Sequence, residues 1–309
     1  MNKVIVIAGP TASGKTGVSI ELAKKLKSEI VSADSVQVYK DMTIGSAKVR
    51  EDEKQNIPHY MIDIKDPKDG YSMADFRREA QEHIDEILSR GITPIIAGGT
   101  GFYIQSVLRD LNLTEEDEDL EFREELEREA KEKGNEYVHN KLKEIDKVSY
   151  VKIHPNNLKR VIRALEFYKH NGRPISEHNI EEKEKDFKYD TCFIVLYFKD
   201  RDKLYERCDM RVDEMIKEGL VDEVKHLIDN GVPKDGVAMQ AIGYKEVVEY
   251  LDGLITEEEM ISKIKLNTRH LVKRQYTWFK NQIPDSIWIP VDELNLDKEK
   301  IVCEIEKYL

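Results

Sequence analysis

The chain has 309 residues, 40% of them hydrophobic, which predicts one large or two smaller packed folding units and argues against disorder. Its net charge of -12 at first argues against a nucleic-acid partner, because an acidic surface repels phosphates. The charge is unevenly spread, however: Thr114 to Glu136 holds 12 acidic and 4 basic residues, whereas Lys263 to Lys280 holds six Lys or Arg and no carboxylate. We expect the first segment to be a solvated helix face and the second to suit a polyanion.

The cysteines and the hydropathy exclude further classes of protein. Cys192, Cys208 and Cys303 are widely separated, which predicts reduced thiols rather than a zinc site or a disulfide framework. The sequence starts directly with a strand pattern and holds no apolar run of about 18 residues, which argues against a signal peptide and a membrane span. We therefore expect a cytoplasmic protein.

Strand and helix patterns alternate from the first residues onward. A β-branched run is followed by a glycine-containing turn and an amphipathic segment, which predicts a strand, a loop and a helix. Such alternation is typical of a parallel sheet. The predicted strands are Lys3 to Ala8, Glu29 to Ser32, Tyr60 to Ile64, Thr93 to Ala97 and Cys192 to Phe198, and the first helices are Thr16 to Leu26 and Met73 to Leu88.

Two regions have helical periodicity throughout. Residues 114–188 are rich in Glu and Lys and show no convincing strand, which predicts an inserted helical subdomain between two parts of the core, 1–113 and 189–309. Beyond Asp200 the predicted helices are Asp202 to Asn230, Ala241 to Leu251 and Glu257 to Lys280, followed by a short strand near Ile287 and a final helix.

The loop after the first strand has the pattern of a phosphate-binding P-loop, G-x-x-x-x-G-K-[ST], between a strand and a helix. Its backbone amides and the helix N-terminus would surround a phosphate, Lys15 would supply a positive charge and Thr16 a hydroxyl for Mg²⁺. The fold class predicted is α/β, a P-loop NTPase-like parallel sheet core with an inserted all-helical subdomain and a helical C-terminal region. The diphosphate-binding residues predicted are Gly9, Pro10, Thr11, Ala12, Ser13, Gly14, Lys15 and Thr16.

A P-loop does not by itself indicate ATP. Nucleotide kinases and ATPases normally carry an acidic Mg²⁺ ligand at the end of a second apolar strand, but here that strand ends in Gly98-Gly99-Thr100-Gly101. A small-molecule or nucleotide kinase and an RNA-binding switch remain alternatives, and the missing carboxylate counts against both. Asp34 follows another strand and would lie at the carboxyl edge of the sheet, where such folds place their sites.

Further motifs follow the P-loop in a fixed order, and together they make the chain resemble the bacterial tRNA dimethylallyltransferases. Each motif alone is weak, but the ordered set covers nearly the whole chain. The motifs are Asp34-Ser35-Val36-Gln37-Val38-Tyr39, Gly98-Gly99-Thr100-Gly101-Phe102-Tyr103, His154-Pro155-Asn156-Asn157 to Arg163-Ala164-Leu165-Glu166, Arg211 to Leu220, Gln240-Ala241-Ile242-Gly243-Tyr244-Lys245 and Lys273-Arg274-Gln275-Tyr276-Thr277-Trp278-Phe279.

The resemblance implies transfer of a dimethylallyl group from dimethylallyl diphosphate to the exocyclic N6 amine of the adenosine adjacent to the anticodon, with Mg²⁺ as the cofactor. It also implies a tRNA anticodon stem-loop clasped between the P-loop core and the helical insertion, and we expect a monomer. The family often has Gln-Arg where this chain has Lys159-Arg160, and the zinc-finger extension of eukaryotic relatives is missing.

Chemistry and resemblance together assign catalytic roles. The adenine amine is a weak nucleophile, so a base should help, and Asp34 is the predicted base, with turn capping as the alternative. Lys15, Thr16, Ser13 and Arg211 would neutralise the departing diphosphate. The Thr100 hydroxyl would approach its bridging oxygen, unless it only satisfies its own backbone. Arg211 would otherwise be a solvated surface charge.

The predicted tRNA contacts come from the matched motifs. Gln37 could read the edge of the target base, and Lys159, Arg160 and Arg163 lie at helical spacing, which suits a phosphate backbone. Trp278 either stacks on RNA or belongs to the core. The full set is Asp34, Ser35, Val36, Gln37, Arg123, Lys159, Arg160, Val161, Ile162, Arg163, Gln240, Ala241, Ile242, Gly243, Tyr244, Lys245, Lys273, Arg274, Gln275, Tyr276, Thr277, Trp278, Phe279 and Lys280.

Overall fold

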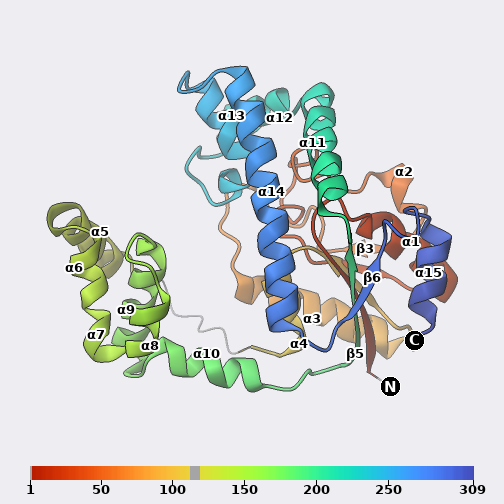
Figure 1. Ribbon diagram of the computed structural model, residues 1–309, viewed down its shortest axis with the longest axis horizontal. Coiled ribbons are helices and arrows are strands. Elements are labelled where there is room, and N and C mark those ends of the chain that lie inside the picture. Colours follow the sequence, from red (N-terminus) through yellow and green to blue (C-terminus); the bar gives the residue numbers. More distant parts are fainter. Residues whose placement is uncertain (1, 112–118) are drawn as a thin grey trace. The chain divides into compact units, whose positions relative to one another are not determined.

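The computed structural model describes residues 2–111 and 119–309. The chain forms two compact units: Met1–Leu108 with Phe187–Leu309, which we call the sheet unit, and Arg109–Asp186, which we call the helical unit (Figure 1). The insertion predicted from the sequence covers residues 114–188, and the part of its acidic run over residues 114–118 lies outside the described residues.

The sheet unit is built on six parallel strands in the order β3-β2-β4-β1-β5-β6. The predicted α/β class with a parallel sheet is therefore confirmed. The central strands are almost wholly apolar because helices cover both of their faces. The strands are β1 (Lys3–Ala8), β2 (Ile30–Ser32), β3 (His59–Tyr60), β4 (Ile95–Gly98), β5 (Asp190–Tyr197) and β6 (Ile287–Pro290).

Alternate residues of β1 enter two separate hydrophobic clusters, one on each face of the sheet. Ile5 and Ile7 pack with α1 (Lys15–Leu26) and α15 (Lys298–Glu306). Val4 and Val6 pack in the cluster that includes α3 (Met73–Ser89) and α4 (Gly101–Leu108). This two-residue period fixes which side chains of each strand face α1.

The C-terminal helices of the sheet unit differ from the prediction at one point. The single helix expected over 202–230 is wrong, because Gly219 adopts a left-handed conformation (φ 99°) that ends one helix before the next begins. A short 3-10 turn, η1 (Ala238–Gln240), separates the second of these helices from the next two. The helices are α11 (Arg201–Glu218), α12 (Leu220–Asp229), α13 (Tyr244–Leu251) and α14 (Glu257–Gln282).

The strand predicted over 60–64 is also shorter than expected. It ends at Tyr60, because Met61 (φ 64°) and Asp63 (φ 56°) leave the extended conformation. A short helix, α2 (Glu51–Lys54), precedes it.

The helical unit has a core of its own, formed by Leu126, Val138, Leu142, Val161 and other apolar residues. Its described residues form helices only: α5 (Leu120–Lys133), α6 (Asn135–Asn140), α7 (Leu142–Ile145), α8 (Lys147–Lys152), α9 (Leu158–Asn171) and α10 (Ile175–Glu184). Across the described residues of both units, no helix combines the length and the apolar character that crossing a membrane requires.

Candidate active site

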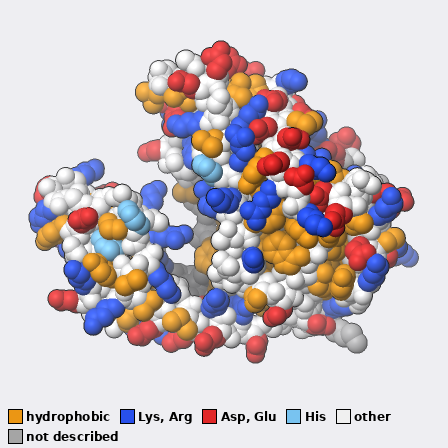
Figure 2. All heavy atoms as spheres, in the orientation of Figure 1, with side chains coloured by type: hydrophobic (Ala, Val, Ile, Leu, Met, Phe, Trp, Pro, Cys, Tyr) orange, Lys and Arg blue, Asp and Glu red, His pale blue; other side chains and the backbone are white. Residues whose placement is uncertain are grey.

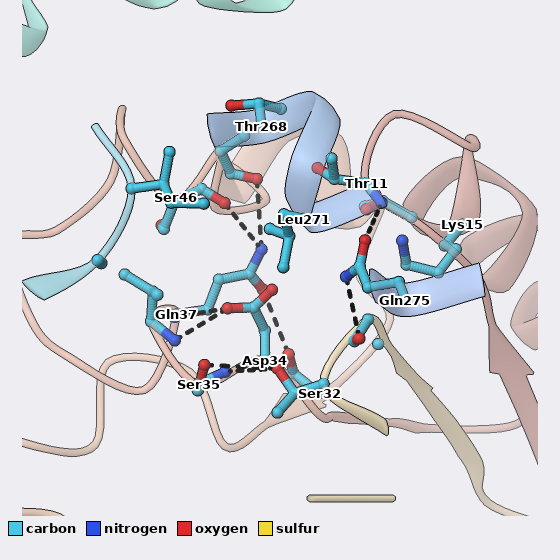
Figure 3. Close-up of a pocket in the computed structure, with 18 of the residues that line it drawn as sticks. Thr11, Lys15, Ser32, Asp34, Ser35, Gln37, Ser46, Thr268, Leu271 and Gln275 are labelled. Carbon is cyan, nitrogen blue, oxygen red and sulfur yellow. Dashed lines mark hydrogen bonds between the residues drawn. The ribbon is translucent and has the colours of Figure 1, made fainter. Parts of the chain in front are cut away.

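A cavity of about 520 Å³ opens at the carboxyl ends of β1, β2 and β4. This is the edge at which parallel α/β sheets place their ligands, and the volume suits a small-molecule site. Residues of α11 and α14 form the opposite wall. Figure 3 shows Ser32, Asp34 and Gln37 on one side of this cavity and Lys15 with Gln275 on the other.

The P-loop connects β1 to α1 as predicted, and Thr11, Lys15 and Thr16 line the cavity. The Lys15 ammonium donates a hydrogen bond to the carbonyl of Pro10 (2.7 Å). The hydroxyl of Ser13 is buried and makes no hydrogen bond to any described residue. A buried hydroxyl without a partner is costly, so an anion held in the loop would give it an acceptor.

Lys15 and Arg211 place two cations beside the P-loop. Burial and the neighbouring Arg211 guanidinium lower the pKa of Lys15 to about 8, and Asp34 opposes this shift. Burial likewise lowers the pKa of Arg211, again with Asp34 opposing. Arg211 makes no hydrogen bond or ion pair within residues 2–111 and 119–309, so its charge is available to a ligand. Two desolvated cations of like charge would be stabilised by a bound polyanion.

A second cavity of about 260 Å³ adjoins the first at the start of α1. Lys15, Thr16 and Arg211 line both cavities, so these three side chains stand between them. Arg207 lies one helical turn before Arg211 and donates from Nε to the carbonyl of Ala12 (3.2 Å). This bond fixes α11, and with it Arg211, against the P-loop.

Asp34 follows β2 and lines the main cavity. Its Oδ1 accepts hydrogen bonds from the backbone N–H groups of Val36 (2.9 Å) and Gln37 (3.3 Å), so the turn-capping alternative is realised in the structure. Both bonds use the same oxygen. Oδ2 makes no hydrogen bond to the described part of the chain and can take a proton from a ligand.

Thr100 and Asp34 are linked through Ser35. The Thr100 hydroxyl oxygen accepts from the backbone N–H of Ser35 (3.2 Å) and lies 3.4 Å from the Ser35 hydroxyl. The backbone N–H of Thr100 donates to the carbonyl of Ala33 (3.2 Å). These bonds join the ends of neighbouring strands β2 and β4, so the predicted base and the predicted leaving-group contact share one cavity wall.

The side chain of Gln37 is held by the protein itself. Its Oε1 accepts from the Ser32 hydroxyl (3.2 Å), and its Nε2 donates to the carbonyls of Ser46 (3.3 Å) and Ala47 (3.4 Å) (Figure 3). The amide therefore lines the cavity with a fixed orientation. Reading a base edge through Gln37 stays a prediction, and it requires the amide to exchange at least one of these partners.

Gln275 of α14 reaches into the same wall. Its Oε1 accepts from the backbone N–H of Thr11 (2.9 Å), and its Nε2 donates to the carbonyl of Gly99 (3.0 Å). A Cβ atom at Gly99 would lie 2.6 Å from that Nε2, and one at Gly101 would lie 2.2 Å from the Trp278 ring. The glycine motif after β4 thus makes room for two side chains of α14, and Trp278 is half-buried against it.

Only part of the basic segment Lys263 to Lys280 is free to meet a ligand. Lys263 pairs with Glu249, Lys265 with Asp213 (2.7 Å) and Arg269 with Asp209 (3.3 Å). The remaining cations, Lys273, Arg274 and Lys280, are exposed and form no ion pair among the described residues. Basic side chains are visible along α14 in Figure 2.

The predicted tRNA contacts at the start of α13 and in α14 divide by burial. Gln240, Ala241, Ile242, Arg274, Gln275 and Trp278 line the cavity, and Lys273, Thr277 and Lys280 are exposed. Lys245 is half-buried, 3.6 Å from Glu246. Phe279 is buried but also lines the cavity. Direct contact with RNA is corrected for Gly243, Tyr244 and Tyr276, which are buried in the sheet unit.

Tyr244 has a structural role instead. Its hydroxyl donates to Oε1 of Glu223 (2.7 Å). The Glu223 carboxylate also accepts from the backbone N–H groups of Thr43 (3.0 Å), Ile44 (2.7 Å) and Gly45 (3.1 Å). This carboxylate holds the loop whose following residues bind the Gln37 amide.

In the helical unit, the residues predicted to contact tRNA are of three kinds: exposed cations, arginines in ion pairs, and buried core residues. Lys159 and Arg160 are exposed and unpaired within the described residues, which suits contact with a backbone phosphate. Arg123 and Arg163 both pair with Glu166, whose side chain is buried. Direct contact is corrected for Val161 and Ile162, which belong to the core of this unit because their side chains face its other helices.

The described residues contain no group of three or more His, Cys, Asp or Glu that could hold a metal ion. Mg²⁺ does not need such a cage, because it is commonly bound by one or two protein oxygens together with phosphate oxygens and water. The Thr16 hydroxyl at the cavity, beside Lys15 and the P-loop amides, fits that mode.

Several residues that line the cavity were not predicted from the sequence. Cys208 and Met215 share the cavity-facing side of α11 with Arg211, and Thr268 and Leu271 share that of α14 with Gln275. Helical spacing from the motif residues could have found all four. His59 enters the cavity because β3 pairs with β2, His59 beside Ile30, which a single sequence does not reveal.

In comparison with known families, the model described as IPP transferase matches residues 37–282. Among curated relatives, the chain is 49% identical over 309 residues to a tRNA dimethylallyltransferase of Acetivibrio thermocellus, covering 100% of this chain and 98% of the relative. It is 51% identical over 307 residues to the tRNA dimethylallyltransferase of Bacillus cytotoxicus, covering 99% and 94%.

Solved structures are similar along the chain as well. A full-length tRNA isopentenylpyrophosphate transferase from Bacillus halodurans aligns with a TM-score of 0.71 at 41% identity, covering 100% of this chain and 98% of that one. A eukaryotic dimethylallyltransferase solved acting on tRNA aligns with a TM-score of 0.77 at 32% identity, covering 94% and 74%.

Proposed function

We propose a reaction for this chain, which belongs to the IPP transferase family and is a tRNA dimethylallyltransferase. In this reaction, the dimethylallyl group of dimethylallyl diphosphate moves to the exocyclic N6 amine of the adenosine adjacent to the anticodon. The bond between N6 and C1 of the donor forms, the bond between C1 and the diphosphate oxygen breaks, and N6 loses one proton. The cavity at the carboxyl edge of the sheet holds both reacting groups.

The donor diphosphate binds at the P-loop. Lys15 and Arg211 neutralise its charge, the amides at the start of α1 donate to its oxygens, and the unpartnered Ser13 hydroxyl adds a further donor. Thr100 lies on the neighbouring strand end, where its hydroxyl can contact the bridging oxygen as it becomes charged. The Thr16 hydroxyl would help to hold Mg²⁺, which would supply positive charge at the leaving group.

Asp34 is the general base. Its Oδ1 is fixed by the N–H groups of Val36 and Gln37, so the carboxylate cannot turn away from the cavity, and Oδ2 is free to accept the N6 proton. Proton removal as the new bond forms compensates for the low nucleophilicity of an amine delocalised into the adenine ring. The tRNA contacts are the unpaired cations Lys273, Arg274 and Lys280 on α14 and Lys159 and Arg160 in the helical unit.

One observation carries the proposal: the P-loop, the cations of Lys15 and Arg211, and the Asp34 carboxylate with its free Oδ2 all line one cavity. The test is mass spectrometry of nucleosides from unmodified tRNA incubated with the protein, Mg²⁺ and dimethylallyl diphosphate, without ATP. We expect adenosine to gain the mass of one dimethylallyl group less one proton. Absence of that product, or a requirement for ATP hydrolysis, would reject the proposal in favour of kinase-like chemistry.

A further inference from the structure

The amide of Gln275 connects two loops that follow different strands. Through Oε1 it holds the N–H of Thr11 in the P-loop, after β1, and through Nε2 it holds the carbonyl of Gly99, after β4 (Figure 3). Both polar atoms of this side chain therefore have partners within the protein at ordinary hydrogen-bond lengths. An RNA contact through the same amide would have to break one of these bonds.

The two loops joined by Gln275 carry opposite sides of the reaction. The P-loop carries Lys15, which faces the donor diphosphate. The Gly99 carbonyl immediately precedes Thr100, whose hydroxyl oxygen is bonded to Ser35, the residue next to Asp34. One continuous path of covalent and hydrogen bonds thus runs from the diphosphate loop through Gln275 to the base.

We propose that Gln275 is a positioning residue for dimethylallyl transfer, which fixes the P-loop at a set distance from the Thr100 turn and so aligns the donor with the acceptor. This inference rests on the proposed function and departs from the expectation that Gln275 contacts tRNA. Its amide acts through Thr11 and Gly99 and touches neither the reacting carbon nor the reacting nitrogen. A displacement of about 1 Å between reacting groups can slow a reaction roughly 100-fold. The two hydrogen bonds of Gln275 should therefore affect the rate of transfer more than the affinity for tRNA.

The close approach of the Gln275 amide to Gly99 gives an independent way to test this role. A Cβ at Gly99 would lie 2.6 Å from Gln275 Nε2, whereas the next nearest atom outside Gln275 is the Gly9 carbonyl oxygen at 3.4 Å. Gly99→Ala should therefore disturb the amide and little else. At Gly98 the obstacle is backbone instead, since a Cβ there would lie 2.1 Å from the carbonyl oxygen of Ala33.

The experiment measures single-turnover transfer at saturating tRNA and dimethylallyl diphosphate, with tRNA Kd and melting curves, for Gln275→Met and Gly99→Ala. We expect each to slow transfer roughly 10- to 100-fold with an unchanged tRNA Kd. Gln81→Met is the matched control, because it also removes a glutamine bond to a backbone carbonyl (Val107, 2.9 Å) but lies outside the site. It should retain wild-type transfer.

A double-mutant cycle makes the test independent of a single variant's stability. Gly99→Ala should slow transfer much less in a Gln275→Ala background than in wild type, whereas Gly98→Ala should cost the same factor in both backgrounds. Wild-type rates in Gln275→Met, a loss confined to tRNA Kd, or equal costs of Gly99→Ala in the two backgrounds would overturn the inference. Failure of the wild-type protein to make any product would instead reject the proposed function.

Discussion

Arg269 of α14 lies 3.3 Å from Asp209 of α11, so its charge is matched inside the protein rather than presented to a ligand. The same holds for Lys265 and Asp213, which lie one turn earlier on α14 and one turn later on α11. The basic segment that stands out in the sequence is therefore two segments: an N-terminal part that fastens α14 to its neighbours and a C-terminal part with exposed, unpaired cations.

This division predicts which cations contribute to tRNA affinity. Lys273→Ala and Arg274→Ala should each weaken tRNA binding and reduce the slope of log K against log salt by about 0.7 to 0.9, because one phosphate contact is lost. Lys265→Ala is the control: it should leave the salt slope unchanged and lower the melting temperature slightly. Filter binding across a salt series checks both, and equal slopes in all four proteins would contradict the assignment.

The pKa of Lys15 predicts how diphosphate affinity depends on pH. Since burial and Arg211 lower the pKa of Lys15 to about 8, the free protein carries this charge below that pH and loses it above. Bound diphosphate favours the ammonium, so Kd should be flat below the pKa and rise up to about tenfold per pH unit above it.

Calorimetric titration with inorganic diphosphate from about pH 6.5 to about pH 9.5, in steps of ~0.5 pH unit on both sides of the Lys15 pKa, measures this dependence. Lys15→Arg keeps its charge at every pH used, so it removes the rise due to residue 15 while the titration of diphosphate itself stays in both curves. Identical pH profiles for the two proteins would show that Lys15 does not control the affinity.

The Glu223 carboxylate predicts a loss of stability without a loss of direct RNA contact. Tyr244→Phe removes one hydrogen bond to Glu223 and should cost about 1 kcal/mol of unfolding free energy, and Glu223→Ala, which leaves three backbone N–H groups without this acceptor, roughly 1–3 kcal/mol. Denaturant melts measure both, with Tyr250→Phe as a control that loses no hydrogen bond within the described residues. A large rise in tRNA Kd for Tyr244→Phe, with unchanged stability, would restore the original assignment.

The fold class and the P-loop were predictable from the sequence, because the strand, loop and helix patterns near Gly9 to Thr16 are local. The side chain of Arg211 was found only through the family resemblance, since a lone arginine on an amphipathic helix gives no local signal. Burial of Tyr244 and Phe279 was not predictable, because a motif shared by a family mixes contact residues with the core residues that support them. The role of Gln275 depends on two partners more than 170 residues away in sequence.

The most direct test of the whole account is single-turnover transfer by Asp34→Asn. Asparagine keeps an Oδ1 that can accept from the N–H groups of Val36 and Gln37, so the turn and the melting temperature should be preserved, but the side chain can no longer take the N6 proton. With saturating tRNA and dimethylallyl diphosphate, we expect the rate to fall roughly 10²- to 10⁴-fold while both ligands bind as before. Near-normal transfer by Asp34→Asn would contradict the assignment of Asp34 as the base and with it the proposed mechanism.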